Sequence, residues 1–273
     1  MKQTIYFNFI YVIESLGAGE VKTGTNIYND VLRYKVKLHE GFGTQLLPVA
    51  NKVEFIAALN EICERTGPLS HRPYLHLEIH GNRAGLGINN GELITWDELY
   101  SLLVRINEKL QNQLFLSLAT CYGAYLFNAI SPFNRSPFFG FVGNVQKIPS
   151  GEIEYAFSEY FSALLEKLDL DEALLALNAA NPNAPFPCIS LTSNALYNLI
   201  CEKLNAKENV RSVKLAIRKR VEKKYKAISK NKSQYSKAEL REKIKAHHYL
   251  RARSLIQQGA YFRFESDHKV LYE

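Results

Sequence analysis

Hydrophobic and polar residues follow a strand-like pattern in several short segments of the first 200 residues. We predict strands at TIYFNFIYVIE (4–14), VLRYKVKL (31–38), YLHLEI (74–79), LFLSLA (114–119), FFGFVG (138–143) and CISLT (188–192). These segments are rich in β-branched and aromatic residues, which fit the half-buried surface of a sheet.

Helical periodicity separates these segments. In residues 51–65, Val53, Ile56, Leu59 and Cys63 recur at helical spacing, and Gly67-Pro68 follows as a stop signal. Thr95 and Glu98 have the spacing of a capping box, which predicts a helix running to about Leu110. Two further amphipathic helices are predicted at 154–168 and 171–179. Strands that alternate with helices predict an α/β domain over residues 1–205, with a mostly parallel central sheet flanked by helices.

The charge distribution sets the last quarter of the chain apart. Residues 206–253 hold 17 Lys and Arg against 4 Asp and Glu, a balance of +13, whereas the remaining residues have a balance of −6. We interpret residues 206–273 as a basic helical C-terminal appendage, with two helices separated by a break near 229–236. It could dock an acidic protein partner or the acidic body, present a solvated face, or bind nucleic acid through phosphates. We favour the first two readings, because no nucleic-acid-binding motif accompanies the segment.

The composition narrows the classes of function. The chain has 273 residues, 47% of them apolar, and four cysteines at positions 63, 121, 188 and 201. No pair of cysteines has the close spacing of metal ligands, so we expect no metal, and a disulfide framework is not indicated. The N-terminus reads as a strand and not as a signal peptide, and no segment reaches the roughly 18 apolar residues of a membrane-spanning helix. We therefore expect a cytoplasmic protein without a membrane partner.

Two strand ends carry the candidate chemistry. LHLEIHGN delivers His80 and Gly81 at the end of one predicted strand, and LFLSLATCYG delivers Cys121 at the end of the next. Ligand sites of open α/β sheets lie at the carboxyl ends of strands, so we expect His80 and Cys121 to meet there. A nearby imidazole shifts a thiol towards thiolate, and the backbone N–H groups of Gly81 and Cys121 could stabilise an oxyanion.

The ordered set of segments resembles caspase-fold cysteine peptidases, and most closely the bacterial CHAT-type branch. The likeness rests on EIHG, SLATCYG, FFGFVGNV, EYAFSEYFSALL and DEALLAL, and covers roughly residues 1–200. It implies a caspase-like fold, His80 and Cys121 as the catalytic dyad, and Gly81 as an oxyanion-hole donor. Caspases have a glutamine two residues before the cysteine, in the pocket that selects aspartate; here that residue is Ala119, so we expect no preference for aspartate.

The favoured hypothesis is a cysteine endopeptidase that needs no cofactor and cleaves a protein or peptide substrate. The resemblance implies regulated proteolysis, in antiviral defence or programmed cell death. The alternatives are a catalytically silent caspase-like interaction module and a nucleic-acid-binding regulator acting through the basic tail.

Glu78 would share a sheet face with His80 and could orient its imidazole, although a solvated or salt-bridged carboxylate is the favoured interpretation. His76 is expected on a strand face and Trp96 in the core at a helix start.

Overall fold

The structure is a computed structural model that describes residues 7–147, 149–180 and 188–205, together with residues 242, 259 and 262–264. It divides into two compact units: residues 1–130 with 135–193, and residues 131–134 with 194–273. The predicted basic appendage lies almost entirely outside the described residues. The first unit holds the sheet and every candidate site residue.

An eight-stranded sheet forms the centre of the first unit. Six strands follow the order β2-β1-β3-β6-β7-β8, and they are parallel except for β8, which runs antiparallel to β7. Their bounds are β1 Phe9–Ser15, β2 Gly43–Pro48, β3 Pro73–Gly81, β6 Phe115–Leu118, β7 Gly140–Gly143 and β8 Ile189–Thr192. A small antiparallel extension, β4 Gly85–Gly87 and β5 Leu93–Thr95, continues from the end of β3.

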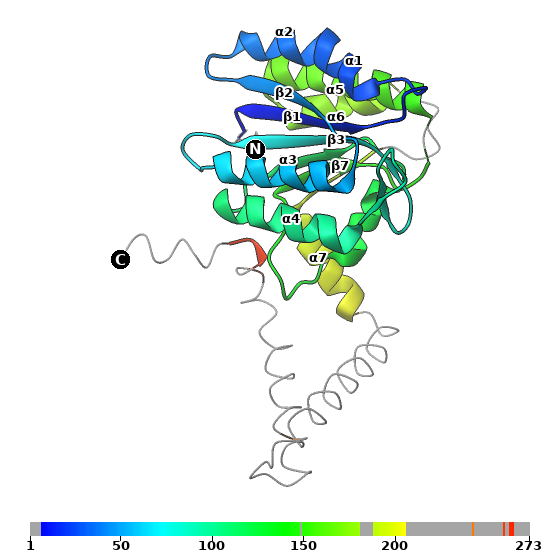
Figure 1. Cartoon of the computed structure of the whole chain (residues 1–273). Coiled ribbons are helices and arrows are strands. Elements are labelled where there is room, and N and C mark those ends of the chain that lie inside the picture. The colour runs from blue at the N-terminus through cyan, green and yellow to red at the C-terminus, as the bar shows by residue number, and fades with distance from the viewer. Residues whose placement is uncertain are drawn as a thin grey trace. The chain divides into compact units, whose positions relative to one another are not determined.

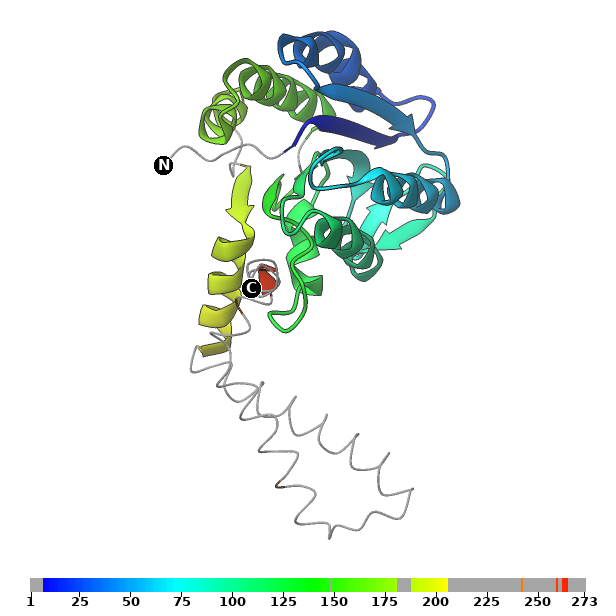
Figure 2. The same cartoon turned by 90° about the vertical axis from the view of Figure 1, so that its left-hand side faces the viewer.

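Helices cover both faces of this sheet, as Figure 1 shows and Figure 2 shows again after a quarter turn. On one face lie α1 Thr23–Ile27, α2 Arg33–Lys35, α5 Ser150–Lys167 and α6 Leu170–Ala179; on the other lie α3 Lys52–Arg65 and α4 Trp96–Lys109. The chain moves from β1 to β2 in one direction along the sheet and then reverses to reach β3. Because parallel crossovers are right-handed, the reversal moves the connecting helices to the opposite face.

Three short segments and one further helix complete the described elements. The π-helical turn η1 Tyr28–Leu32 and the 3-10 turn η2 Val36–Leu38 flank α2, and the 3-10 segment η3 Gly123–Ala129 follows β6. The helix α7 Ser193–Asn205 follows β8 in the chain.

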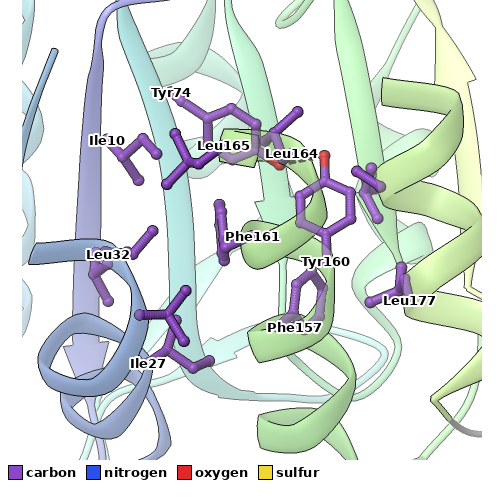
Figure 3. Packing of buried hydrophobic residues seen from close by; sticks show 14 of the residues in the cluster. Ile10, Ile27, Leu32, Tyr74, Phe157, Tyr160, Phe161, Leu164, Leu165 and Leu177 are labelled. Carbon is purple, nitrogen blue, oxygen red and sulfur yellow. Dashed lines mark hydrogen bonds between the residues drawn. The ribbon is translucent and has the colours of Figure 1, made fainter. Parts of the chain in front are cut away.

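The main core lies between the sheet and α5. Figure 3 shows Tyr160, Phe161 and their neighbours on α5 packed against strand residues such as Ile10 and Tyr74. The Tyr74 hydroxyl donates a hydrogen bond of 3.0 Å to the Tyr160 hydroxyl, so the one polar pair in this view is satisfied inside the core. Burial on this scale, at about 25 cal/mol per Å² of apolar surface, is the main stabilising contribution to the unit.

Most of the predicted elements are confirmed. The strands predicted at 74–79, 114–119, 138–143 and 188–192 correspond to β3, β6, β7 and β8, and the four predicted helices are present. The capping box at Thr95 and Glu98 is formed as expected, and Trp96 is buried at the start of α4. The α/β class with a mostly parallel sheet is therefore confirmed.

One predicted strand is wrong. Residues 31–38 are helical, through η1, α2 and η2, and the strand beside β1 is instead β2. Two buried pairs have the i,i+4 spacing of a helix: Ile27 with Val31, and Leu32 with Val36. The helical period was therefore present in a segment whose apolar and polar residues were interpreted as strand-like alternation. The β2 sequence GTQLLP is half polar because it forms the sheet edge, where no residue is fully buried.

The buried face of α3 also differs from the prediction. Val53 is 75% exposed, and the buried residues are Phe55, Leu59, Ile62 and Cys63. The buried face of α3 is therefore rotated about the helix axis relative to the predicted one, because Asn51 caps the helix and Val53 falls in the exposed first turn.

Candidate active site

The sheet has a topological switch point between β1 and β3. Connections leave β1 towards β2 on one side, and the chain continues from β3 towards β6 and β7 on the other. In open α/β sheets, loops that diverge at such a point leave a crevice at the carboxyl ends of the strands, where ligands bind. The candidate residues His80 and Cys121 follow strands that belong to this region of the sheet.

Strand register brings His80 and Cys121 together. β3 and β6 pair in parallel from Tyr74 with Phe115 to Leu77 with Leu118, and Ala119 N–H donates to the Leu77 carbonyl over 3.0 Å. β6 ends at Leu118, and beyond it the Cys121 carbonyl lies against Gly81, so the chain at Cys121 lies next to the end of β3. Both side chains line one cavity of about 320 Å³. The His80 side chain is 60% exposed and Cys121 is half-buried, so the pair is open to a substrate from solvent.

Gly81 fits tightly against the backbone of the neighbouring strand end. A Cβ atom at this position would lie 2.1 Å from the Cys121 carbonyl oxygen and 2.2 Å from the Thr120 hydroxyl. Only glycine permits this approach, since both contacts are far shorter than van der Waals separation. The structure therefore places the Gly81 backbone directly against the Cys121 carbonyl.

The turn after Cys121 is anchored to the loop that follows β7. Tyr122 adopts a left-handed conformation with φ of 60°, and its N–H donates to the Gln146 carbonyl over 3.2 Å. Ala124 N–H donates to the Asn144 carbonyl over 3.0 Å. The Tyr122 N–H is thus occupied within the protein, and these bonds fix the position of Cys121 at the turn.

A carboxylate missed by the sequence analysis contacts His80. Glu20, in the glycine-rich loop after β1, accepts a hydrogen bond of 2.7 Å from His80 Nε2 through Oε1. Its other oxygen accepts from the Gly17 N–H, which with the His80 contact lowers the pKa of Glu20. Sequence spacing could not indicate this contact, because Glu20 and His80 are 60 residues apart and meet only when β1 pairs with β3.

Glu78 does not contact His80. It is buried, and its two oxygens accept from the Thr23 hydroxyl over 2.7 Å and face His76 Nε2 at 2.9 Å. Of the two favoured alternatives, the solvated carboxylate is wrong because Glu78 is buried, whereas the pairing with His76 agrees with the salt-bridged one. Glu20 is the residue that holds the His80 imidazole.

His76 is the centre of a buried polar row. It is fully buried on the face of β3, with Nδ1 at 2.7 Å from the Ser117 hydroxyl and Nε2 against Glu78. The rings of Phe157 and Phe161 pack on it with centroid distances of 4.9 Å. The prediction that His76 lies on a strand face is confirmed. The buried polar row reaches from the core to the cavity, because Glu78 also lines that cavity.

Ala119 lines the same cavity. Apolar and charged neighbours share the lining, including Leu16, Ile153, Lys147 and the carboxylate residues Glu20 and Glu78. Among the described residues, no group of His, Cys, Asp and Glu is arranged to hold a metal ion.

The other cysteines have different surroundings. Cys63 is buried in α3. The Cys188 thiol donates to Asn144 Oδ1, and burial raises the pKa of Cys188 to about 11. A thiol of that pKa is almost entirely protonated at neutral pH and is a weak nucleophile.

Comparison with known proteins adds no family assignment. No protein-family model and no curated protein sequence matches the chain. No helix in the described ranges is long and apolar enough to cross a membrane.

Proposed function

We propose that this protein is a cysteine endopeptidase with a caspase-like fold, in which Cys121 is the nucleophile and His80 its acid–base partner. The observation that carries the proposal is that His80 and Cys121, from two different strand ends, line one solvent-open cavity at the carboxyl edge of a parallel sheet. A cysteine beside an imidazole at such an edge fits nucleophilic attack on a carbonyl.

The reaction proceeds through an acyl-enzyme. The Cys121 thiolate attacks the scissile carbonyl carbon, and the carbonyl oxygen takes up the negative charge. Protonated His80 gives its proton to the amine as the C–N bond breaks, which leaves a thioester on Cys121. Water then attacks the thioester, His80 accepts a proton from that water, and the Cys121 thiolate leaves as the carboxylic acid product forms.

Glu20 positions the imidazole during these steps. With the Nε2–H donated to the Glu20 carboxylate, the neutral ring carries its lone pair on Nδ1, which is the atom available for proton exchange. The lowered pKa of Glu20 keeps this acceptor ionised at neutral pH.

The oxyanion would be stabilised by the backbone N–H groups of Gly81 and Cys121. The close packing of Gly81 on the Cys121 carbonyl supports a fixed distance between these two groups. Fixed donors contribute because they need no reorganisation as charge develops, and removing one such donor typically lowers kcat by about 100- to 1,000-fold.

The decisive experiment is cleavage of a mixed peptide library by the full chain. We expect cleavage by the native protein, loss of cleavage in Cys121→Ala and in His80→Ala, and retention in the matched control Cys201→Ala. Mass spectrometry of the products locates the scissile bond, and circular dichroism verifies that each variant is folded.

Two results would reject the proposal. Cleavage that persists in Cys121→Ala would assign the activity to another group or to a contaminant. Absence of cleavage together with absence of preferential Cys121 alkylation would favour the silent interaction module. Regulated cleavage of a protein substrate, in antiviral defence or programmed cell death, is the role that the resemblance to the CHAT-type branch suggests.

A further inference from the structure

The cavity beside the proposed dyad has an acidic floor. Its volume of about 320 Å³ is at the small end of ligand pockets, which run from about 300 to 1,000 Å³. Two carboxylate residues, Glu20 and Glu78, line it against one cation, Lys147. Glu78 is only 2% exposed, whereas Lys147 is exposed, so the buried carboxylate is the less screened charge.

Ala119 lies beside this carboxylate in the cavity lining. Glu78 and Ala119 directly follow the paired residues Leu77 and Leu118, and the Ala119 N–H bonds the Leu77 carbonyl, so the two residues are neighbours at the end of the β3–β6 pair. Neighbouring residues of paired strands share a face, so Ala119 presents only a methyl group beside the carboxylate. A longer side chain here would fill the space in front of Glu78.

Three neighbours hold the Glu78 carboxylate in one orientation. Thr23 donates to one oxygen, and His76, itself fixed by Ser117, contacts the other. The backbone of Gly24 closes the remaining side, because a Cβ there would lie 2.8 Å from Glu78 Cγ. An ionised carboxylate has about four acceptor positions, and these two bonds use two of them. Acceptor positions therefore remain for a cation entering from the cavity.

We propose that this cavity is the S1 subsite and that it takes a lysine or arginine side chain, with Glu78 at its floor and Glu20 near its entrance. This inference rests on the proposed peptidase function, since it needs a substrate acyl group at Cys121. An ammonium or guanidinium group forms a charge-assisted hydrogen bond with a carboxylate. An aspartate side chain would instead meet two like charges, and a leucine would bring no donor to the remaining acceptor positions of Glu78.

The test uses three fluorogenic peptides that differ only in arginine, leucine or aspartate before the scissile bond. We expect the native full chain to have the highest kcat/KM with arginine. Glu78→Gln keeps the shape of the side chain and removes its charge, so the arginine-to-leucine ratio of kcat/KM should fall on the order of 100-fold. The matched control Glu154→Gln, on α5 and outside the cavity lining, should leave the ratio unchanged.

A second variant covers the possibility that Glu78→Gln does not fold, as judged by its melting transition. Ala119→Leu fills the space in front of the carboxylate and should lower the same ratio. A native preference for leucine or aspartate, or an unchanged ratio in folded Glu78→Gln, overturns the inference. If the leucine or aspartate peptide is cleaved and Cys121→Ala abolishes that cleavage, the proposed function stands while the inference falls. If none of the three is cleaved and iodoacetamide shows no His80-dependent preference for Cys121, both fall.

Discussion

Gly81 and Cys121 illustrate how single residues determine the candidate site. The backbone of Gly81 approaches the Cys121 carbonyl so closely that any side chain would collide with it. The sequence indicated Gly81 as a candidate oxyanion donor after His80; its packing against the Cys121 carbonyl gives a physical reason why glycine is required. The distance between the proposed oxyanion donors depends on that contact.

Gly81→Ala should reduce peptidase activity by about 100-fold or more, because the new methyl group forces the two strand ends apart and a displacement near 1 Å has that effect. Gly87→Ala on the adjacent β4 is the matched control, since its Cβ would meet no atom closer than 3.9 Å. The measurement is kcat/KM on the best peptide substrate, with the melting temperature of both variants. Equal activity in the two variants would show that the close approach has no role in catalysis.

The reactivity of the cysteines should differ with their surroundings. At pH 7.5 we expect iodoacetamide to modify Cys121 fastest among the four, because it is half-buried in an open cavity beside His80. Cys188 should react slowly, since burial raises its pKa to about 11 and leaves only about one thiol in 3,000 ionised. Peptide mapping by mass spectrometry gives the individual rates. Raising the pH towards 11 should accelerate Cys188, and faster modification of Cys188 than of Cys121 at pH 7.5 would contradict the assignment.

At the scale of the element, α4 has a well-defined start. Thr95 accepts from the Glu98 N–H, and the Glu98 carboxylate accepts from the Thr95 N–H, which satisfies two backbone donors of the first turn. Lys52 from α3 also binds the Glu98 carboxylate over 2.7 Å. The cap therefore links the two helices that cover one face of the sheet.

Thr95→Ala should lower the free energy of unfolding by about 0.5–2 kcal/mol, the usual cost of losing an N-cap. Ser101→Ala in the same helix removes an exposed hydroxyl that bonds only the Asp97 carbonyl, and should change stability little. Urea denaturation at neutral pH measures both. A similar effect of the two substitutions would mean that the cap contributes nothing specific.

The same cap should make stability depend on acid pH. Hydrogen bonds from Lys52 and Thr95 lower the pKa of Glu98 from 4.5 to about 2. Because the pKa of Glu98 is lower in the folded protein than in the unfolded chain, the ionised carboxylate stabilises the fold above about pH 4.5. This stabilisation is lost as the pH falls towards 2. Glu98→Gln should therefore flatten the stability profile between pH 4.5 and 2, as followed by melting temperature. An unchanged slope would show that Glu98 does not contribute to acid denaturation.

At the scale of the whole molecule, the first unit is held by a core that contains a buried hydroxyl pair. Burial raises the pKa of Tyr74 to about 12, so this hydroxyl stays protonated and donates to Tyr160. Tyr160→Phe should cost about 1–2 kcal/mol of unfolding free energy, because the Tyr74 donor loses its acceptor in the core. Tyr155→Phe, 57% exposed on the same helix, should stay within about 0.5 kcal/mol. Equal stability of both variants in chemical denaturation would contradict a structural role for the pair.

The opposite charges of the two parts of the chain predict an ordered tail. Residues 206–253 carry +13 and the rest −6, so we expect the tail to dock on the body or on an acidic partner. Limited chymotrypsin digestion at low salt should then leave residues beyond 206 largely intact. Rapid loss of this segment with full peptidase activity in the remaining body would contradict the prediction, and tight, strongly salt-dependent nucleic-acid binding would favour the regulator alternative.

The sequence by itself determined the α/β class of the fold and indicated two of the candidate site residues. Strong local patterns specify β3, β6 and the helices α3, α4, α5 and α6, and the two strand ends carrying His80 and Cys121 are recognisable from adjacent residues. It failed at β2, because an edge strand has a weak hydrophobic pattern, and in residues 31–38, where apolar alternation and helical spacing coincide.

Only the tertiary structure decided how these residues are combined. Strand order places the loop after β1 beside the end of β3, so Glu20 reaches His80 across 60 residues of chain. The packing of α1 and α5 on the sheet buries Glu78 with Thr23 and His76, although its sequence position allowed a solvated carboxylate equally well. Local patterns report which face of an element is apolar; contacts between elements distant in sequence depend on strand order, which no local pattern encodes.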